Sequence, residues 1–379
     1  MAHKKTLILV GGGHTHSLLL KKIQKKPLPD TRLILLSSTR YTAYSGMLPG
    51  VISGYYSPEQ AHIDLKQLAK YSGCDFFEES VNQLNTESRT LLTDSGNTYS
   101  YDLLSINIGS TQSPTVKANQ CRSIKPIGQF LYWLYHELPD DLEAQPHPIE
   151  LVIIGAGAAG VETAMALKQR YFGDHRIQVH IISSSQILPG YPDAIQSMAL
   201  KELASANIQV HPEFRVSSIK DQQLLSAQGQ SLPYHQLLLA TSASPPDWPS
   251  ISGLATDANG FILINEQLQS ISHSNVFSAG DIATINQSDL AKCGVHAVRQ
   301  ANTLYTNLLN ALIGQPLRSF QAQKQTLTLL NCSNGQAIAS RGWFRAKGQW
   351  VWFWKRFLDR QFMKQFPAAP SEAFKINKR

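Results

Sequence analysis

Two copies of one β-α-β pattern constrain the fold of this chain more than any other feature of its sequence. In each copy a short apolar run stops at closely spaced glycines and is followed by a helical stretch and a second apolar run. The predicted strand, helix and strand cover 6–10, about 15–25 and 32–36 in the first copy, and 151–154, 161–170 and 177–182 in the second. Because Gly11 and Gly155 lie 144 residues apart, we expect two α/β domains of the same kind.

The second copy carries the glycine spacing that binds a dinucleotide, Gly155-Ala-Gly157-Ala-Ala-Gly160. The first glycine permits the tight bend, the second lets a pyrophosphate approach, and the third lets the helix pack close to the strand. A glycine turn without a ligand is the competing interpretation, but the strand, the helix and the next strand are all in place. We therefore predict that a nicotinamide nucleotide binds here, at Gly155, Gly157, Ala158, Gly160 and Ser183.

The first copy departs from this spacing. Gly11 and Gly13 are present, but His16 stands where the third glycine belongs, which predicts looser helix packing or a reshaped phosphate site. Both copies also lack the acidic residue that usually follows the second strand and binds a ribose hydroxyl, because serines occupy 37–38 and 183–185. These stretches do not distinguish NADH from NADPH.

The composition describes a globular chain of 379 residues, enough for two to three domains. No segment reaches the roughly 18 apolar residues of a membrane-spanning helix, and the first apolar run is too short for a signal peptide, so a cytoplasmic location is expected. The net charge of +7 resides in 341–379, where ten Lys and Arg face two Asp and Glu; without a recognition motif, nucleic-acid binding is not expected. The scattered cysteines predict neither a disulfide framework nor a metal site: Cys74, Cys121, Cys293 and Cys332.

The order of segments indicates three parts. The stretch 138–148 is rich in prolines and acids and is predicted as a connection between domains. Asn275–Ala283 reads NVFSAGDIA, a strand that ends in Gly-Asp, and a helix is predicted from about 293 to 313. The domains expected are a discontinuous one at 1–115 and 255–315, a second at 116–254, and a small C-terminal element at 316–379.

With these motifs the chain resembles the pyridine nucleotide-disulfide oxidoreductases, flavoproteins with two Rossmann-type domains. It is similar to the type II NADH dehydrogenase-like branch, and in particular to the NADH dehydrogenase-like module fused to some selenide,water dikinases. The implied fold is α/β, with an FAD-binding and an NAD(P)-binding domain and a small C-terminal α+β element. The segments that carry the resemblance are VGGGHTHSLLL (10–20), RYTAYSGMLPGVISGYYS (40–57), HIDL (62–65), YDLLSINIGS (101–110) and VHAVRQANTLYTNL (295–308).

The resemblance implies roles for individual residues. Asp281 matches the aspartate that holds the ribityl chain of FAD, and a helix N-cap is its alternative role. Glu162 matches an acid found near the nicotinamide, or it is an ordinary glutamate in the first turn of a helix. The FAD-binding residues implied in this way are Gly11, Gly13, His14, Thr15, Arg40, Gly109, Gly280, Asp281 and His296.

The segment 40–54 is where a disulfide reductase carries its redox cysteine pair, and here it contains no cysteine. The reduced flavin must then pass electrons directly to an acceptor. The glutamine motif that lines the quinone site of type II NADH dehydrogenases is not reproduced, because Val295 and Arg299 stand at its glutamine positions. Three residues of the segment either shape the pocket beside the flavin or pack within the loop: Tyr44, Met47 and Pro49.

Large apolar side chains recur at helical spacing near the C-terminus, with basic residues between them. One interpretation is a helix that lies on an anionic membrane surface, which would place the protein on the inner face of the membrane. The other, which we favour slightly, is that the stripe packs on the core or on the partner in a homodimer. The stripe comprises Trp350, Phe353, Trp354, Phe357, Leu358, Phe362 and Phe366, and the basic residues are Lys355, Arg356, Arg360 and Lys364.

The expected function is hydride transfer from NADH or NADPH to FAD, followed by electron transfer to a quinone or another small acceptor. A sulfide:quinone-type reductase is the alternative enzyme, and it requires Cys121 and Cys332 to meet in the fold. A flavoprotein redox sensor or binding module with little turnover, serving selenium metabolism, is the alternative that is not an enzyme.

Overall fold

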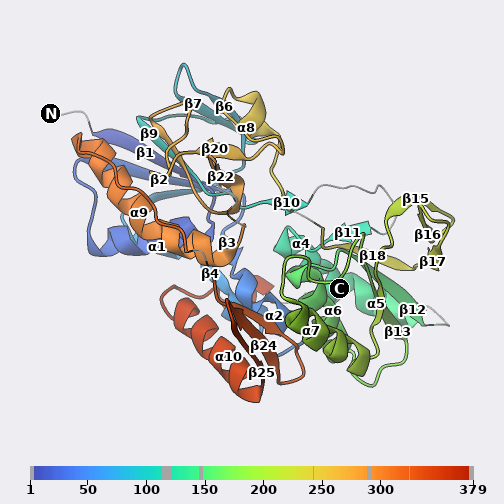
Figure 1. Cartoon of the computed structure of the whole chain (residues 1–379). Helices are drawn as coiled ribbons and strands as arrows, with labels where there is room; N and C mark the ends of the chain where they lie inside the picture. The colour runs from blue at the N-terminus through green and yellow to red at the C-terminus, as the bar shows by residue number, and fades with distance from the viewer. Residues whose placement is uncertain are drawn as a thin grey trace.

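Two five-stranded parallel sheets, each covered by helices, and a smaller C-terminal unit make up the protein (Figure 1). The structure is a computed structural model and describes residues 4–112, 121–144, 148–241, 243–287, 290, 292–323 and 325–374. In both sheets the strand that leads into the glycine turn is central. This arrangement confirms the predicted α/β class with two Rossmann-like units.

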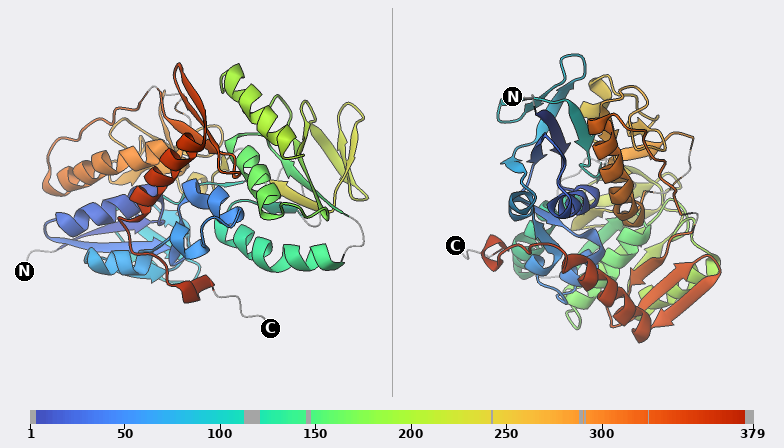
Figure 2. Two further views of the ribbon diagram at one scale, coloured as in Figure 1. Left: turned by 90° about the horizontal axis from the view of Figure 1, so that it is seen from below. Right: turned by 90° about the vertical axis from the view of Figure 1, so that its left-hand side faces the viewer.

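The first sheet has the order β21-β9-β1-β2-β5 and is parallel throughout. Its central strands are apolar without alternation because the sheet is covered on both faces, and Leu7, Ile8 and Leu9 are fully buried. Helices α1 and α9 lie side by side against it (Figures 1 and 2). The elements are β1 (Lys5–Val10), α1 (His14–Lys25), β2 (Thr31–Ser37), α3 (Leu65–Tyr71), β5 (Asp75–Glu78), β9 (Leu103–Ile106), β21 (Val276–Ser278) and α9 (Gly294–Ile313).

Smaller elements are inserted between these strands. An antiparallel pair, β3 and β4, brackets the segment that contains α2, and β6, β7 and β8 form an antiparallel meander. The short strands β20 and β22 pair in parallel next to β21. Their bounds are β3 (Tyr41–Ala43), η1 (Ser45–Met47), α2 (Leu48–Ile52), η2 (Pro58–Ala61), β4 (His62–Asp64), β6 (Val81–Asn85), β7 (Thr90–Thr93), β8 (Thr98–Ser100), α8 (Trp248–Ile251), β20 (Ile262–Ile264), η4 (Gly280–Ile282) and β22 (Ala283–Ile285).

The second sheet has the order β11-β18-β12-β13-β14 and repeats the first, with β13 and then β14 outside the glycine-turn strand β12. A meander of β15, β16 and β17 covers part of one face and closes a second apolar core. The elements are β11 (Cys121–Ser123), α4 (Ile127–Tyr132), η3 (Trp133–Glu137), β12 (Ile149–Ile154), α6 (Ala158–Arg170), β13 (Ile177–Ile182), α7 (Asp193–Ser205), β14 (Gln209–His211), β15 (Val216–Lys220), β16 (Gln223–Ser226), β17 (Ser231–Pro233) and β18 (Gln236–Leu239).

The prediction that 138–148 is a connection between domains is wrong for 138–144. Residues 138–144 form the helix α5 (Leu138–Ala144), which buries Leu138 and Leu142 against the second unit. The chain crosses between the two halves at β10 (Thr111–Gln112) and β19 (Ala243–Ser244), which pair antiparallel (Figure 1). Acidic and proline residues suggested a loop, but the apolar spacing of the two leucines decides for a helix.

The C-terminal unit is an antiparallel sheet of three strands with helix α10 packed on it, and it lies between the two halves (Figure 2). Glu202 of α7 fastens its sheet to the second half, because its buried carboxylate pairs with Lys347 and accepts a hydrogen bond of 2.8 Å from Asn334 Nδ2. The elements are β23 (Thr328–Asn331), β24 (Ala337–Arg341), β25 (Phe344–Gly348), α10 (Gln349–Met363) and η5 (Ser371–Phe374).

Helix α10 contradicts one half of our favoured interpretation, packing on the core, whereas packing on the partner in a homodimer stays a prediction. The prediction that the aromatic stripe packs on the core of the chain is wrong for Trp350, Phe353 and Phe357, whose side chains are 55%, 58% and 63% exposed. It is right for Phe366, which is buried, while Trp354, Leu358 and Phe362 are half-buried. The residues of α10 that face inward are Val351, Trp352, Lys355, Asp359 and Met363.

Candidate active site

The first glycine turn lies against the end of β9. Gly11 has φ +89°, and a Cβ atom there would come within 2.5 Å of the backbone oxygen of Asn107. The Gly13 N–H donates to that same oxygen at 3.1 Å. As the N-cap of α1, Gly13 offers no side chain to the first N–H groups of the helix; the His16 N–H donates to Asn107 Oδ1, and those of His14 and Thr15 are left for a phosphate.

His16 reshapes this turn rather than loosening it. Its imidazole is fully buried, with Nδ1 at 2.7 Å from the Gly11 carbonyl oxygen and Nε2 at 2.8 Å from Ser105 Oγ. Because a carbonyl oxygen only accepts, Nδ1 carries the proton and Nε2 accepts from the Ser105 hydroxyl. Burial lowers the pKa of His16 to about 4, so the ring is neutral at physiological pH.

Asn107 is a residue whose importance the sequence did not reveal. Its buried amide accepts from the His16 N–H at 3.2 Å and donates to the Ala279 carbonyl at 2.7 Å. Gly280, with φ +72°, must be glycine here, because a Cβ atom would lie 2.4 Å from Asn107 Nδ2. The amide thereby sets the glycine turn and the Ser278-Ala-Gly-Asp turn at a fixed distance.

Asp281 follows at the surface of this junction, with its side chain 27% exposed. Lys125, which the sequence analysis did not select, places Nζ 3.5 Å from Asp281 Oδ2 and 3.3 Å from Ser110 Oγ. Nearby, the buried ring nitrogen Nδ1 of His296 has no hydrogen-bond partner in the part of the chain that the structure describes, and no atom of that part lies within 4 Å of a Cβ added at Gly109.

These features fit the cofactor that the sequence implies. An orphaned imidazole nitrogen, an accessible carboxylate and open space beside Gly109 suit the ribityl hydroxyls and ring of FAD, and uncapped N–H groups suit its pyrophosphate. Thr15 is the exception among the predicted FAD residues, because its buried hydroxyl donates to the Ala297 carbonyl at 2.8 Å and joins α1 to α9.

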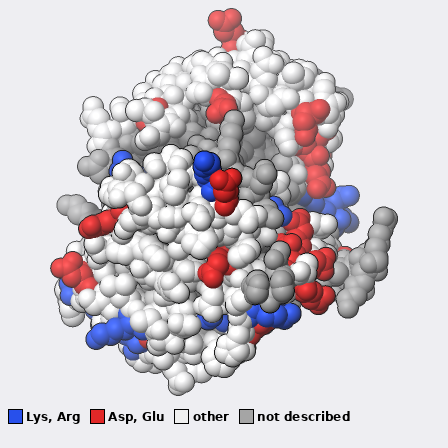
Figure 3. Space-filling view, turned by 90° about the vertical axis from the view of Figure 1, so that its right-hand side faces the viewer, with Lys and Arg blue, Asp and Glu red and all other residues white. Residues whose placement is uncertain are grey.

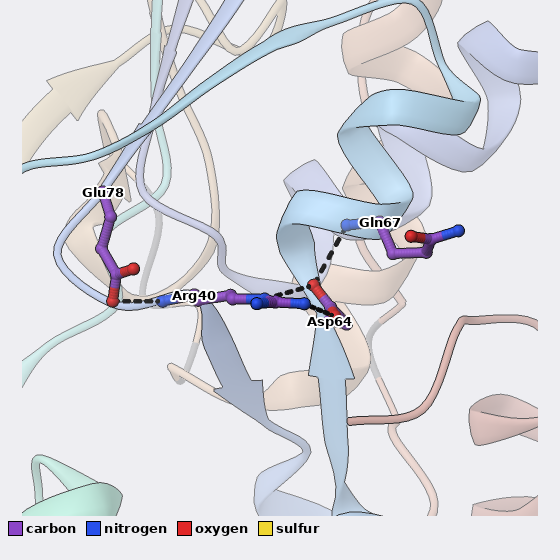
Figure 4. A network of polar contacts seen from close by, with 4 residues as sticks. All are labelled: Arg40, Asp64, Gln67 and Glu78. Carbon is purple, nitrogen blue, oxygen red and sulfur yellow. Dashed lines mark hydrogen bonds and ion pairs between the residues drawn. The ribbon is translucent and has the colours of Figure 1, made fainter. Parts of the chain in front are cut away.

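Arg40 is committed to a partner within the protein (Figure 4). Its guanidinium donates to both carboxylate oxygens of Asp64, Nε at 3.1 Å and Nη2 at 2.7 Å. Its backbone N–H donates to Glu78 Oε1 at 3.0 Å. Burial opposes ionisation of Asp64, but the bonds from Arg40 and from the Gln67 N–H outweigh it and lower the pKa of that carboxyl. Any FAD contact by Arg40 uses the remaining face of the guanidinium.

The second glycine turn repeats the first. Gly155 has φ +115° and its Cβ position lies 2.5 Å from the Ala240 oxygen, while a Cβ at Gly160 would lie 1.9 Å from the Gly155 oxygen. Among the described residues nothing lies within 4 Å of a Cβ at Gly157, so this glycine leaves space for a ligand. Helix α6 begins at Ala158, directly after this open position.

Glu162 of α6 meets the C-terminal unit. Its Oε1 accepts a hydrogen bond of 2.7 Å from the Asn331 N–H of β23. Burial raises the pKa of Glu162 to about 7, against the opposing effects of the Lys355 ammonium and the Asn331 N–H. The glutamate is therefore no ordinary solvated residue of a first helical turn.

The buried face of α10 completes this region with an ion pair. Lys355 Nζ lies 2.9 Å from Asp359 Oδ2 and donates to the Gly46 carbonyl at 2.7 Å. The Tyr44 ring stacks on Phe362 with centroids 4.4 Å apart, and burial together with Asp359 raises the pKa of its hydroxyl. His14 contacts Tyr44 edge-on at 5.3 Å.

The three pocket candidates of the segment 40–54 thus differ. Tyr44 is half-buried and lies between His14, Phe362 and Asp359, whereas Met47 and Pro49 are buried. Ser183, another predicted nucleotide contact, directly follows β13 and donates its N–H to the His211 carbonyl at 3.0 Å. Sequence reasoning missed Lys355 and Asp359, because charged residues four apart on a helix usually form a solvated pair.

The cysteines do not support a sulfide-type relay. All four are free thiols. Cys332 belongs to the main apolar core, whereas Cys121 packs against the separate core between the second sheet and its meander. Burial raises the pKa of both thiols, which disfavours the nucleophilic thiolate.

Comparison with known proteins agrees with this geometry. Residues 5–301 match the family model of the pyridine nucleotide-disulphide oxidoreductases. Ferroptosis suppressor protein 1 of Taeniopygia guttata is 22% identical over 68% of this chain and 69% of its own. The alternative NAD(P)H-ubiquinone oxidoreductase C1 of Arabidopsis thaliana is 22% identical over 82% of this chain and 68% of its own.

Two solved structures share the fold over nearly the whole chain. The NDH2 of Plasmodium falciparum in complex with NADH superimposes with a TM-score of 0.80 at 16% identity, covering 95% of this chain and 97% of its own. The sulfide:quinone oxidoreductase of Aquifex aeolicus gives 0.79 at 18% identity, covering 97% and 94%.

The fold and the two glycine turns define a flavoprotein oxidoreductase with two dinucleotide-binding sites. The chain belongs to the pyridine nucleotide-disulphide oxidoreductase family. The predicted cofactors, FAD and a nicotinamide nucleotide, are confirmed at this level. The fit of FAD to the first turn and of the nucleotide to the second, residue by residue, stays a prediction.

We predict that substitution of two glycines of the second turn has different effects, one on nucleotide binding and the other on the stability of the fold. Gly157→Val has space for its side chain, so the fold and the FAD content should be retained, while reduction of the flavin by a nucleotide slows about 100-fold because the pyrophosphate is blocked. Gly160→Val should instead destabilise the fold, because its Cβ collides with the Gly155 backbone. Thermal unfolding and single-turnover kinetics measure both, and an unfolded Gly157→Val would contradict the assignment.

The buried His16 should make stability depend on pH. The unfolded chain binds a proton near pH 6.5, whereas the folded chain binds it only near pH 4, so folding loses stability as the pH falls through this window, by about 3 kcal/mol in full. In His16→Asn this contribution is absent. Urea unfolding of both proteins between pH 4.5 and 7.5 measures the difference, and parallel stability curves would refute the neutral buried ring.

Proposed function

We propose that the chain transfers hydride from a nicotinamide nucleotide to FAD and then reduces a quinone, without a redox disulfide. FAD would bind the part formed by 1–115 and 255–315, and the nucleotide the part formed by 116–254. The names of the Arabidopsis relative and of the Plasmodium neighbour support this reading. The selenium-linked sensor and the sulfide reductase have no comparable support in the site.

The observation that carries the proposal is what occupies the place of the cysteine pair. Tyr44 and Gly46 lie there, and the buried Lys355–Asp359 pair of α10 closes over them. The segment 40–54 contains no cysteine and therefore offers no thiol or disulfide to accept electrons, but it adjoins groups that hold protons. Reduction of a quinone to a quinol consumes two protons, so such groups suit this acceptor.

FAD, when bound, supplies the two-electron chemistry. The chain supplies binding and protons. Glu162, with a pKa of about 7, is partly protonated at neutral pH and can give up a proton at its carboxyl. Lys355 holds its proton through Asp359 and the Gly46 carbonyl, so it acts as a fixed positive charge beside the site.

A membrane surface is the proposed source of the quinone. Among the described residues, no helix is long and apolar enough to cross a membrane. Helix α10, however, exposes Trp350, Phe353 and Phe357, with Arg360 exposed on the same helix and Lys364 exposed directly after it. Aromatic side chains with neighbouring cations bind the interface of an anionic bilayer. The face shown in Figure 3, by contrast, intersperses acidic and basic side chains.

An anaerobic spectrum tests the proposed reaction. We expect NADH or NADPH to bleach a flavin band near ~450 nm and a soluble quinone to restore it. The variant Glu162→Gln, which removes the titrating proton, should retain bleaching and slow the recovery. A flavin that neither nucleotide reduces would reject the enzyme reading in favour of a sensor, and recovery with sulfur acceptors alone would reject the quinone.

A second experiment tests the docking face. The triple variant Trp350→Ser, Phe353→Ser, Phe357→Ser should lose co-sedimentation with vesicles of phosphatidylcholine and phosphatidylglycerol, and binding of the wild type should weaken with salt. The control is Phe172→Ser, which removes an aromatic side chain that is 83% exposed outside the C-terminal unit. A different outcome would contradict the membrane proposal: the triple variant still binds vesicles, the wild type is a dimer, and the triple variant is a monomer. That outcome would make this face a subunit interface.

A further inference from the structure

The structure supplies the acid that the sequence of the nucleotide site lacks. In dinucleotide-binding units a carboxylate after the second strand accepts the ribose hydroxyls. In this chain β13 is followed by Ser183, Ser184 and Ser185, none of which carries a charge, and the loop 183–191 contains no Lys or Arg either. A charged residue that contacts the ribose of the nucleotide must therefore come from another element.

Glu213 reaches this position from the neighbouring strand. Strand β14 pairs in parallel with the outer edge of β13, with Ile182 opposite His211, so both strands end at the same edge of the sheet. The chain after β14 is tied to the serine loop by backbone bonds. The Phe214 N–H donates to the Ser183 carbonyl at 2.7 Å, and the Glu213 N–H donates to the Ser185 carbonyl at 3.4 Å.

The backbone at Glu213 turns its side chain toward that loop. Its φ of +57° is in the left-handed region, which a glutamate seldom adopts. Phe214, buried in the second core, holds the chain in this turn. The exposed carboxylate accepts a hydrogen bond from Gln186 Nε2 at 3.3 Å, so it lies beside the serine loop. The donor of that bond is a neutral amide and not a cation.

The first Rossmann unit repeats the arrangement independently. Strand β2 ends at Ser37 and is followed by Ser38, and its outer neighbour β5 ends at Glu78, directly opposite Ser37 in the register. Glu78 Oε1 accepts the N–H of Arg40, the residue just past those serines (Figure 4). In both units, then, the acid lies one strand further out than usual, at the same edge of the sheet.

We propose that Glu213 accepts the ribose hydroxyls of the bound nucleotide and thereby selects NADH over NADPH. This inference rests on the proposed function and adds the identity of the nucleotide to it. A carboxylate accepts hydrogen bonds from the 2′- and 3′-hydroxyls, whereas a 2′-phosphate would face it with like charge. Arg215, two residues on and also exposed, is the cation that would favour NADPH if it faced the ribose instead.

Anaerobic stopped-flow reduction of the full-length holoprotein tests the preference. We expect the reduction rate constant divided by the nucleotide dissociation constant to be at least about tenfold higher for NADH than for NADPH. In Glu213→Gln this ratio should fall toward one, because NADH binds less tightly and NADPH is no longer repelled, while flavin content is unchanged. Equal use of the two nucleotides by the wild type, or an NADPH preference, would overturn the proposal.

A matched control is Asp221→Asn. It removes the same charge from the same part of the chain, at an exposed position that also has a positive φ, +49°, in the turn between β15 and β16. Its NADH preference should equal that of the wild type. A ratio that shifts equally in both variants would show a general effect of net charge and refute a specific role for Glu213.

Calorimetric binding of NAD⁺ and NADP⁺ separates this inference from the proposed reaction. A preference for NAD⁺ that disappears in Glu213→Gln supports the inference even if no nucleotide reduces the flavin, and in that case the proposed function alone fails. Binding of NADP⁺ as tight as that of NAD⁺ to the wild type rejects the inference even if the flavin is reduced and quinone reoxidises it.

Discussion

The amide of Asn107 fixes the relative positions of segments that lie far apart in the sequence. It accepts from the N–H of His16 in α1 and donates to the carbonyl of Ala279 after β21. The Asn107 side chain requires glycine at two neighbouring positions, because a Cβ atom at Gly13 or Gly280 would come within 2.4 Å of it. A side-chain amide both accepts and donates, so one residue can hold the first glycine turn and the turn that contains Asp281 together.

The sequence predicted those features of the fold that depend on local backbone geometry. The glycine turns, the apolar runs and the helices beside them were found within a few residues of their bounds, because tight turns and side-chain periodicity are local properties. The missing glycine at 16 was visible too, but its compensation was not. His16 bonds to Ser105, 89 residues away, and no local pattern reports such a partner.

Helix α10 shows the limit of periodicity more sharply. The spacing of its aromatic residues predicted the helix, but not which of these residues turn inward. The buried Lys355–Asp359 pair decides the rotation, because the Gly46 carbonyl and the Tyr44 hydroxyl from the first half receive it. Those partners become neighbours of α10 only after folding. Glu213 escaped notice for a related reason, since only the pairing of β13 with β14 brings it beside the serines at 183–185.

The C-terminal unit also acts as a strut between the two halves. Lys355 is bonded to the Gly46 carbonyl on one side, and the Asn331 N–H to Glu162 on the other, each at 2.7 Å. A hinge rotation of one half against the other must break at least one of these bonds. The separation of the two dinucleotides is thus set by a part of the chain that belongs to neither glycine turn, and the stiffness of that part limits how far the separation can fluctuate.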